Sequence, residues 1–327
     1  MERKVEMKND VIVALDIGTL YLKLLIRENG RIKKMELARR PVEENNLFFL
    51  LQEWVGKYNL KRKPCFYSIS GPEVNIQYFS FPPLSSEELS SAIRVEAEQI
   101  LDKDLAKMDS DFYLLNKDKK GEKVLFVASP RLLNDEKALF VRRVGMKPTG
   151  LNLQSIALAN GYLAANKNSP ITLLLNIGHR ITNLAIVEKE KLLFIRDIAW
   201  GGEELVREIV KKSTFQMPAV INLLAKGEEF AGINFSEIVE KVVPAFLGEI
   251  VKTLDYCEQH DKIKVKNLVV TGGGSQTPQL TEFLSRKLAL NLENWRPLEK
   301  LNFMNEEKKK LTPFCGIVLG LSLQNYD

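Results

Sequence analysis

VIVALDIG, at Val11–Gly18, is the stretch that decides the fold, together with the run TLYLK at residues 19–23 that follows it. An apolar run ends in an acidic residue and a glycine, and the chain then turns into a second apolar strand. A buried strand can carry one carboxylate, Asp16, to its end, and the glycine lets the turn come close to a bound anion. The pattern alone also fits an ordinary hairpin, so a phosphate site and a plain hairpin both stay open here.

The same pattern returns halfway along the chain. ITLLLNIG, at Ile171–Gly178, aligns with the first stretch without a gap, at a constant offset of 160 residues from Asp16 to Asn176. Identical residues at this offset are Ile17 and Ile177, Gly18 and Gly178, Leu24 and Leu184, Ile26 and Ile186, and Glu28 and Glu188. A chain that repeats its strand–turn–strand unit is expected to have two similar halves with a cleft between them.

Composition and charge exclude several classes of protein. The 327 residues are enough for two domains, and 45% hydrophobic with 27% charged residues indicate a folded globular chain. The 47 basic and 42 acidic residues are spread along the chain, which argues against nucleic-acid binding. Three separated cysteines and two histidines argue against a zinc site and favour a reducing compartment. Without a signal peptide or a membrane-length apolar run, we expect a cytoplasmic protein with no direct membrane insertion.

A glycine-rich turn follows the strand predicted at Asn267–Thr271, in the run LVVTGGGSQTPQL. Its three glycines let the backbone approach a ligand without an intervening side chain. A tight strand-to-helix connection is the alternative, although such a connection seldom needs three glycines. The run has neither the lysine of a P-loop nor the spacing of a dinucleotide fingerprint.

Residues 72–148, between the two repeats, predict a small α+β unit. Val74–Phe81 alternates as a strand, and Ser85–Glu88 begins a helix that extends to about Ile100. Two strands and a helix at Pro130–Val144 follow.

The chain after the second repeat predicts mainly helices. Residues 203–260 are helical, and Pro244 is expected near the start of a helix at Phe246–Glu258. FCGIVLGLSL, at Phe314–Leu323, predicts a small-residue helix. Its Gly316 and Gly320 share one face, which predicts close packing on a neighbouring element.

These units together resemble the actin/Hsp70/sugar-kinase ATPase superfamily. VIVALDIGTLYLKLL is similar to its first phosphate motif, ITLLLNIGHRITNLAIV to the second, TGGGSQTP to the adenosine motif, and FCGIVLGLSL to the second connecting helix. Within the superfamily, Ser68–Leu101, Ile195–Leu205 and Ala219–Gly227 resemble the type IV pilus assembly protein PilM family, which is related to FtsA. The resemblance covers essentially the whole chain. It implies an α/β, actin-like fold with two duplicated halves around a nucleotide cleft and an FtsA-like inserted α+β subdomain.

The resemblance also implies domain boundaries. The first half, subdomain 1A, would comprise residues 1–71, with returns at 149–170 and, through the C-terminal helix, at 313–327. The inserted subdomain 1C would comprise 72–148. The second half would consist of subdomain 2A at 171–202 and 265–312, and of the helical subdomain 2B at 203–264.

Site residues and cofactors follow from the same resemblance, with ATP and Mg²⁺ as the expected ligands. Asp16 would hold Mg²⁺ through water, and Gln154 stands where relatives position the attacking water. The residues expected to bind phosphate are Gly18, Thr19 and Lys23 from the first half and Gly178, His179, Arg180 and Thr182 from the second. Those expected around the adenosine are Gly272, Gly273 and Gly274, with Glu249 and Lys252, in a segment similar to one that contacts the nucleoside, reaching the ribose or base.

Asn176 departs from the family pattern, because the second motif usually begins with Asp. An amide cannot supply the charge that helps to hold the metal and the attacking water. We therefore expect nucleotide binding to survive and ATP hydrolysis to be weak or absent. Two plainer interpretations stay open: Asn176 as a structural cap of the strand end, and His179 as an exposed side chain.

The function that the resemblance implies is a cytoplasmic ATP-binding scaffold of type IV pilus assembly, or of a related type II secretion-like system. In the family, the protein binds the N-terminal cytoplasmic tail of a PilN-like inner-membrane partner, which recruits it to the inner face of the inner membrane. It then links that partner to the pilus motor ATPase that drives twitching motility. We expect the tail in a groove at the insert, near Ser68–Glu98; self-association stays open.

Two other functions remain as alternatives. An FtsA-like filament protein would carry a C-terminal amphipathic membrane helix, and the chain stops shortly after FCGIVLGLSL. A small-molecule kinase of the same superfamily would need a catalytic carboxylate against a substrate hydroxyl, and Asn176 argues against that role.

Overall fold

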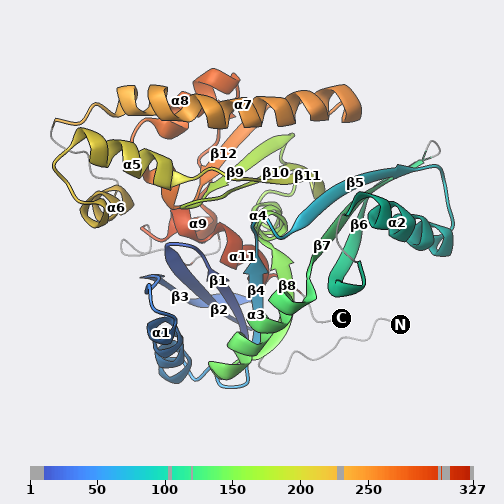
Figure 1. The fold of residues 1–327 in the computed structure, drawn as a ribbon, viewed down its shortest axis with the longest axis horizontal. Helices are drawn as coiled ribbons and strands as arrows, with labels where there is room; N and C mark the ends of the chain where they lie inside the picture. The colour runs from blue at the N-terminus through green and yellow to red at the C-terminus, as the bar shows by residue number, and fades with distance from the viewer. Residues whose placement is uncertain are drawn as a thin grey trace.

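Two five-stranded sheets lie one above the other, with a third, smaller sheet to one side (Figure 1). The computed structural model describes residues 11–101, 105–118, 121–226, 232–300, 303 and 310–324. The outer ends of the predicted ranges 1–71 and 313–327, and Gly227 at the end of one matched segment, lie outside these residues.

The first sheet has the order β3-β2-β1-β4-β8. Its strands are β1 (Val11–Ile17), β2 (Tyr21–Glu28), β3 (Arg31–Arg39), β4 (Pro64–Ile69) and β8 (Lys147–Leu153). The first three strands are an antiparallel meander, and β4 and β8 are added in parallel. The inner strands are continuous apolar runs because both faces of this sheet are covered.

The second sheet repeats this order and these directions as β11-β10-β9-β12-β13. Its strands are β9 (Thr172–Ile177), β10 (Thr182–Glu188), β11 (Lys191–Ile198), β12 (Asn267–Thr271) and β13 (Asn291–Leu292). Asp16 is paired with Lys23 in the first sheet, and Asn176 with Asn183 in the second, so the 160-residue offset holds in three dimensions. The predicted duplicated halves are confirmed.

Helices α1 (Glu44–Lys57) and α3 (Arg131–Arg143) cover the outer face of the first sheet (Figure 1). Leu51 and Trp54 of α1 are buried in one cluster with Val141 of α3. The boundary at residue 148 groups α3 with the insert. The boundaries stay predictions, and this packing favours an insert that ends before α3.

Helices α4 (Gln154–Leu163) and α11 (Gly316–Ser322) lie between the two large sheets. They cross so closely that a Cβ atom on Gly320 would lie 1.7 Å from the carbonyl oxygen of Ala157. A Cβ atom on Gly161 would lie 2.6 Å from the carbonyl oxygen of Gly316. The close packing predicted for the glycine face of Phe314–Leu323 is confirmed.

The outer face of the second sheet is covered by helices. These are α7 (Phe235–Asp261) and α8 (Leu280–Leu288), and α5 (Gly202–Lys212) and α6 (Met217–Ala225) lie at one side of the same sheet (Figure 1). The short α9 (Pro297–Lys300) lies between the two large sheets, where its Leu298 is buried in one cluster with Ala14 and Phe314. Helix α7 passes through Pro244, so the prediction of a helix start near this proline is wrong. Asn234 caps the helix instead, and the apolar face with Val243 and Phe246 is buried on both sides of the proline, so tertiary packing outweighs the local cost.

The insert is a three-stranded sheet of order β5-β7-β6 with one helix on its face. Its elements are β5 (Asn75–Phe81), α2 (Ser86–Ile100), β6 (Met108–Asp118) and β7 (Gly121–Pro130). The predicted helix start is confirmed by a capping box, in which Ser85 Oγ accepts from the N–H of Glu88 and Glu88 Oε2 accepts from the N–H of Ser85.

The insert lies beside β11 of the second half (Figure 1). Tyr78 joins the two parts, because its hydroxyl donates to the carbonyl of Ile195 (2.8 Å) and accepts from the N–H of the same residue (2.6 Å). Its ring stacks on Phe194 at 4.6 Å between centroids.

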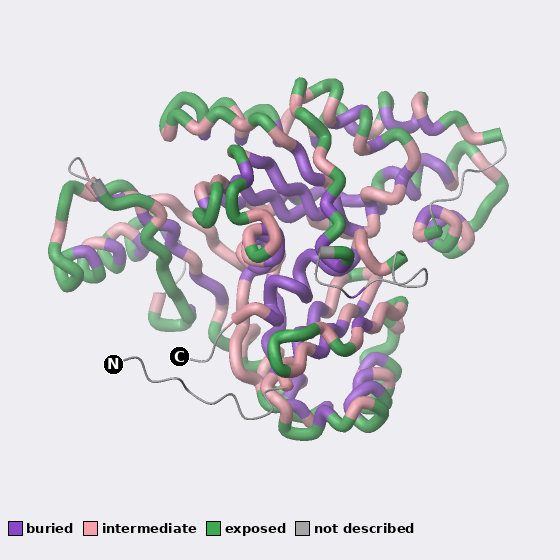
Figure 2. The backbone as a smooth tube through the Cα atoms, turned by 180° about the vertical axis from the view of Figure 1, so that it is seen from behind, coloured by how far each residue is buried: buried purple, intermediate pink, exposed green. Residues whose placement is uncertain are grey.

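Burial is highest in the strands of the two large sheets and in the helices between them, whereas the outward helix faces are exposed (Figure 2). Among the described residues, no helix combines the length and apolar character that a membrane crossing requires.

Candidate functional site

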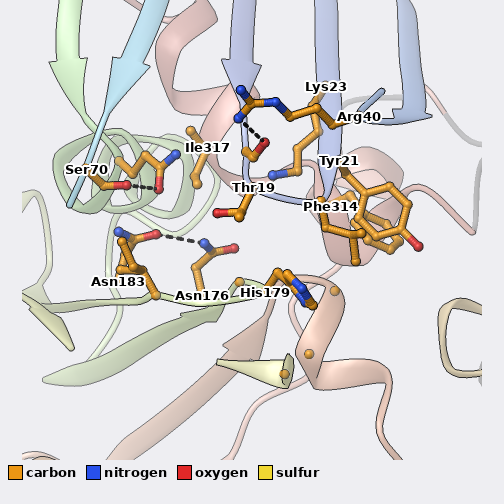
Figure 3. Close-up of a pocket in the computed structure, with 18 of the residues that line it drawn as sticks. Thr19, Tyr21, Lys23, Arg40, Ser70, Asn176, His179, Asn183, Phe314 and Ile317 are labelled. Carbon is orange, nitrogen blue, oxygen red and sulfur yellow. Dashed lines mark hydrogen bonds between the residues drawn. The ribbon is translucent and has the colours of Figure 1, made fainter. Parts of the chain in front are cut away.

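A cleft opens between the two large sheets, at the ends of β1 and β9 (Figure 3). The strand–turn–strand units of both halves contribute to it. Of the predicted site residues, those that line it are Gly18, Thr19, Lys23, Gln154, Asn176, Gly178, His179, Gly273 and Gly274. Residues from both repeats, 160 positions apart, therefore face one space.

The turns of the two halves have the same backbone geometry. The N–H of Gly18 donates to the carbonyl of Tyr21 at 3.0 Å, and the N–H of Gly178 donates to the carbonyl of Ile181 at 3.0 Å. A Cβ atom on either glycine would lie 2.9 or 2.6 Å from that carbonyl oxygen. Only glycine fits each turn without a shift of the backbone, because the turn closes on its own carbonyl. The predicted approach of these turns to an anion stays a prediction.

Asp16 is fully buried at the end of β1, and three side chains surround its carboxylate. Lys23 Nζ lies 2.6 Å from Oδ2, while Ser68 Oγ donates to Oδ1 at 2.6 Å and Gln154 Nε2 donates to the same oxygen at 2.7 Å. The Gln154 amide oxygen accepts in turn from Ser70 Oγ at 2.8 Å (Figure 3). A buried carboxylate needs such partners, and here Lys23 supplies the opposite charge.

The matching position of the second half carries a chain of neutral side chains that ends in a carboxylate. Asn176 Nδ2 donates to Asn183 Oδ1 at 2.9 Å, and Asn183 Nδ2 donates to Asp197 Oδ1 at 2.8 Å. Asp197 also accepts from the backbone N–H of Gly71 at the start of the insert. Burial raises the pKa of the Asp197 carboxyl, and these two donors only partly oppose that effect. Asn176 is therefore bonded as a structural amide, and it also lines the cleft.

The remaining predicted residues of the second turn have different surroundings. His179 is half-buried and lines the cleft, and burial lowers its pKa from the ordinary value. Arg180 is largely exposed and donates to Glu203 at 2.9 Å. Thr182 is fully buried, and its hydroxyl donates to the carbonyl of Trp200. Only His179 of these three faces the cleft.

The glycine-rich turn after β12 divides between packing and lining. Gly272 has a φ of +89°, and a Cβ atom there would lie 2.4 Å from the carbonyl oxygen of Ile177, so it packs on the end of β9. Gly273 and Gly274 line the cleft. A short 3-10 helix, Gly273–Gln276, replaces a direct entry into α8.

Glu249 and Lys252 lie outside the residues that line the cleft. Glu249 accepts from Arg196 at 2.7 Å and from Lys252 at 2.8 Å. Lys252 lines a second cavity of about 610 Å³ between the insert, β11 and α7. The helical spacing of this segment could not reveal which face of α7 meets the sheet.

Four apolar side chains that the sequence interpretation missed form one wall of the cleft. They come from α5 and α6 and are Val206, Ile221, Leu224 and Ala225. Ile221, Leu224 and Ala225 belong to the run AVINLLAKG, which resembled the family without indicating what these side chains contact, and Val206 belongs to no motif that the sequence offered.

Two basic side chains, also missed, line the cleft from the first half. Arg40 follows β3, and its Nη1 lies 3.4 Å from the carbonyl oxygen of Gly18. Lys137 lies on α3, and burial together with the nearby Arg40 lowers its pKa. Neither residue belongs to a recognisable motif.

Comparison with known proteins agrees with the duplicated fold. A structure entitled "PilM-PilN type IV pilus biogenesis complex" superposes with a TM-score of 0.81 at 20% identity, covering 95% of this chain and 97% of that one. The ethanolamine utilization protein EutJ from Carboxydothermus hydrogenoformans gives 0.54 at 14% identity, with 97% and 90% covered. ADP-bound MreB5 of Spiroplasma citri gives 0.51 at 10% identity, with 92% and 97% covered. These likenesses show an actin-like fold.

A family profile described as type IV pilus assembly protein PilM matches residues 50–325, which is most of the chain. The match includes the insert, the second repeat, the glycine-rich turn and the C-terminal helix. The chain belongs to the PilM family of type IV pilus assembly proteins.

Proposed function

We propose that this chain is an actin-like scaffold of pilus assembly that binds ATP with Mg²⁺ in the cleft and a PilN-like membrane partner at the insert. The observation that carries the nucleotide part is the pair of identical glycine turns facing one cleft. Phosphate oxygens need backbone N–H groups and cations close by. The N–H groups of Gly18 and Gly178 close their own turns, so those of the next residues, Thr19 and His179, would bind the phosphates. MreB5 of Spiroplasma citri, which has a similar fold, has a crystal structure with bound ADP, and this supports an adenine nucleotide as the ligand here.

The two ends of the cleft suit the two ends of a nucleotide. Lys23 and His179 lie at the glycine turns, where phosphates would bind. The apolar wall with Ile221 and Leu224 faces the backbone of Gly273 and Gly274, and a flat base fits between such surfaces.

The described residues fit a magnesium ion that arrives with the nucleotide. No group of three or more His, Cys, Asp or Glu among them could hold a metal ion. Asp16 can accept from metal-bound water if Lys23 moves to a phosphate, and Mg²⁺ usually keeps several waters and binds phosphate oxygens. Mg²⁺ would supply charge neutralisation, and Asn176 adds no second carboxylate, so we propose weak or absent hydrolysis.

The partner site that we propose is the outer edge of β6. No strand pairs with this edge among the residues that the structure describes. The residues from Asp109 to Leu114 are all exposed, and Phe112 and Tyr113 are 40% and 54% exposed. The N–H of Phe112 donates to the Asp111 side chain at 2.8 Å. An extended peptide can add to such an edge as another strand.

A groove next to this edge can take side chains of the peptide. It has a volume of about 410 Å³ and is lined by Ile93 and Arg94 of α2 together with Phe112, Phe126 and Arg131. Ile93 and Arg94 fall within the region Ser68–Glu98 that the sequence indicated. The partner would be the cytoplasmic tail of a PilN-like protein, which would recruit this chain to the inner membrane and bring it near the pilus motor ATPase.

Calorimetric titration tests both parts of the proposal. The unaltered chain is titrated with ATP and Mg²⁺, and then with a synthetic peptide of the N-terminal tail of the neighbouring PilN-like protein. We expect one nucleotide site and one peptide site per chain. Absence of nucleotide binding would overturn the first part, and absence of peptide binding the second.

A pair of phenylalanine variants locates the peptide. Phe112→Ser should weaken the peptide at least about tenfold, because an apolar anchor is lost. Phe49→Ser is the matched control, since Phe49 is 63% exposed on α1, away from the insert. Equal peptide affinity in both variants would exclude the β6 edge.

A further inference from the structure

Two basic side chains in the cleft have no protein counter-ion among the described residues. Lys23 is paired with Asp16, whereas Lys137 forms no ion pair or hydrogen bond within the part of the chain that the structure describes. Arg40 makes only a 3.4 Å contact with a carbonyl oxygen through its guanidinium. Both side chains line the cleft, and Lys137 is half-buried.

The surroundings of Lys137 make this arrangement costly without an anion. Burial and the positive charge of Arg40 both lower the pKa of Lys137. Asp16 and Glu73 act in the opposite direction, but neither is within ion-pair distance of it. Two like charges beside each other in a partly dry space repel, and a bound anion would relieve that repulsion.

The position of Lys137 indicates which part of a nucleotide it would meet. The apolar wall of the cleft belongs to α5 and α6, which pack on the second sheet, whereas Lys137 belongs to α3, which packs on the first sheet (Figure 1). A nucleotide with its base against Ile221 therefore extends its phosphates toward the first half. Lys137 lies close enough to Arg40 and Asp16 for their charges to act on it, and Arg40 contacts the carbonyl oxygen of Gly18. The two cations therefore lie at the phosphate end of the cleft, where the phosphate farthest from the base would bind.

We propose that Lys137 and Arg40 bind the terminal phosphate of a nucleoside triphosphate, so that the cleft distinguishes the triphosphate from the diphosphate. This inference rests on the proposed nucleotide binding and adds the recognition of its phosphate state. Lys137 lies on the helix that follows β7 of the insert directly, at Pro130 and Arg131. The same helix is fixed to the first half by the buried Val141.

The test compares two ligands in three proteins. Affinities for ADP and for a non-hydrolysable ATP analogue, both with Mg²⁺, are measured by calorimetry for the unaltered chain, Lys137→Gln and Lys147→Gln. In Lys137→Gln the ATP analogue should bind about tenfold to a hundredfold more weakly, because a charge-assisted hydrogen bond is lost, while ADP should change less than about twofold. Lys147 is exposed on β8 outside the cleft, so Lys147→Gln removes the same charge and should change neither ligand.

Two variants and one fold check keep the result decisive. Lys137→Arg should retain the preference for the triphosphate, Arg40→Gln should reduce it, and thermal unfolding shows whether each variant is folded. If Lys137→Gln weakens ADP and the ATP analogue by the same factor, or weakens neither, the inference is overturned while the proposed nucleotide binding stands. If the unaltered chain binds neither ligand, both the inference and the nucleotide proposal fail.

Discussion

The two glycine turns of the cleft have the same backbone geometry, but a charged pair of side chains lies beside the first and a neutral pair beside the second. Asp16 on β1 pairs with Lys23 on β2 in the first half, whereas Asn176 on β9 pairs with Asn183 on β10 in the second. The carboxylate of the second half lies one strand further out, at Asp197 on β11. A repeated fold therefore fixes where side chains meet without fixing their charge. The charged chemistry of this cleft is concentrated in the first half.

The largest effect should come from breaking the charged pair of the first half. Asp16→Asn or Lys23→Asn alone leaves a buried charge without its partner and should lower the free energy of unfolding by about 3–5 kcal/mol. The double variant reproduces the amide pair of the second half and should lose less than the sum, by about 1–3 kcal/mol. Urea unfolding measures all three.

A control for this cycle lies on the next hairpin, between β2 and β3. Lys33 and Glu28 form an exposed pair at 3.3 Å, and their replacement by Asn should change stability by less than about 1 kcal/mol. Additive losses at Asp16 and Lys23 would contradict the comparison, because they would mean that the two side chains do not depend on each other.

Breaking the amide chain of the second half should cost less. Asn183→Leu leaves the Asn176 amide without its acceptor and the Asp197 carboxyl with only the N–H of Gly71, and a buried polar group that loses its partner costs about 1–3 kcal/mol. The free energy of unfolding should fall accordingly in denaturant titrations. A change below about 0.5 kcal/mol, the usual range of surface substitutions, would mean that these hydrogen-bonded side chains do not stabilise the second half.

Asp197→Asn removes the charge at the end of this series of hydrogen-bonded side chains and keeps an acceptor for Asn183. Since burial raises the pKa of Asp197 in the folded state above the ordinary 3.8, the folded state binds more protons than the unfolded state in that range. Stability should therefore fall as pH rises through and above about 3.8. The Asn variant, which can still accept from Asn183, should lack this fall; an unchanged pH dependence would assign it to another group.

Hydrolysis should respond to a carboxylate in the second turn. Asn176→Asp supplies the missing charge. A turn of the Asn183 amide would give the new carboxylate a donor, at the cost of the hydrogen bond from Asn183 to Asp197. We expect phosphate release from ATP to rise about tenfold, which corresponds to about 1.4 kcal/mol of barrier. No increase would mean that Asn176 is not what limits turnover.

The smallest expected effect is the pH dependence that His179, which stands where the first turn has Thr19, gives to nucleotide binding. Burial lowers the pKa of His179 below the ordinary 6.5, so the free protein should lose stability as pH falls through this region. A bound phosphate favours the protonated ring, so nucleotide affinity should rise about twofold to threefold below pH 6.5, an effect of less than about 1 kcal/mol. His179→Gln should abolish the rise and His260→Gln, on α7, should retain it; a rise that persists without His179 would contradict this assignment.

The sequence predicted the parts of the fold that local patterns determine. The strand–turn–strand units, their offset and the glycine face of Phe314–Leu323 follow from alternation, apolar runs and small residues. The course of α7 through Pro244 could not be predicted, because packing on the second sheet outweighs the local effect of proline.

Site residues were harder to predict where the path of the chain through the fold determines which side chains face the cleft. Glu249 and Lys252 are on the expected helix, but the face of that helix toward the cleft depends on how α7 crosses the sheet. Arg40 and Lys137 carry no motif, and only the fold brings them beside the first turn. The turn glycines were predictable because close backbone approach requires glycine wherever the turn occurs.

A crystal structure of the chain with Mg²⁺ and a non-hydrolysable ATP analogue tests the central claim most directly. The account expects the phosphates between Gly18 and Gly178, the base against Ile221, and Lys23 moved from Asp16 to a phosphate oxygen. A nucleotide bound outside this cleft, or one bound with the pair of Asp16 and Lys23 intact and no phosphate at the turns, would contradict it.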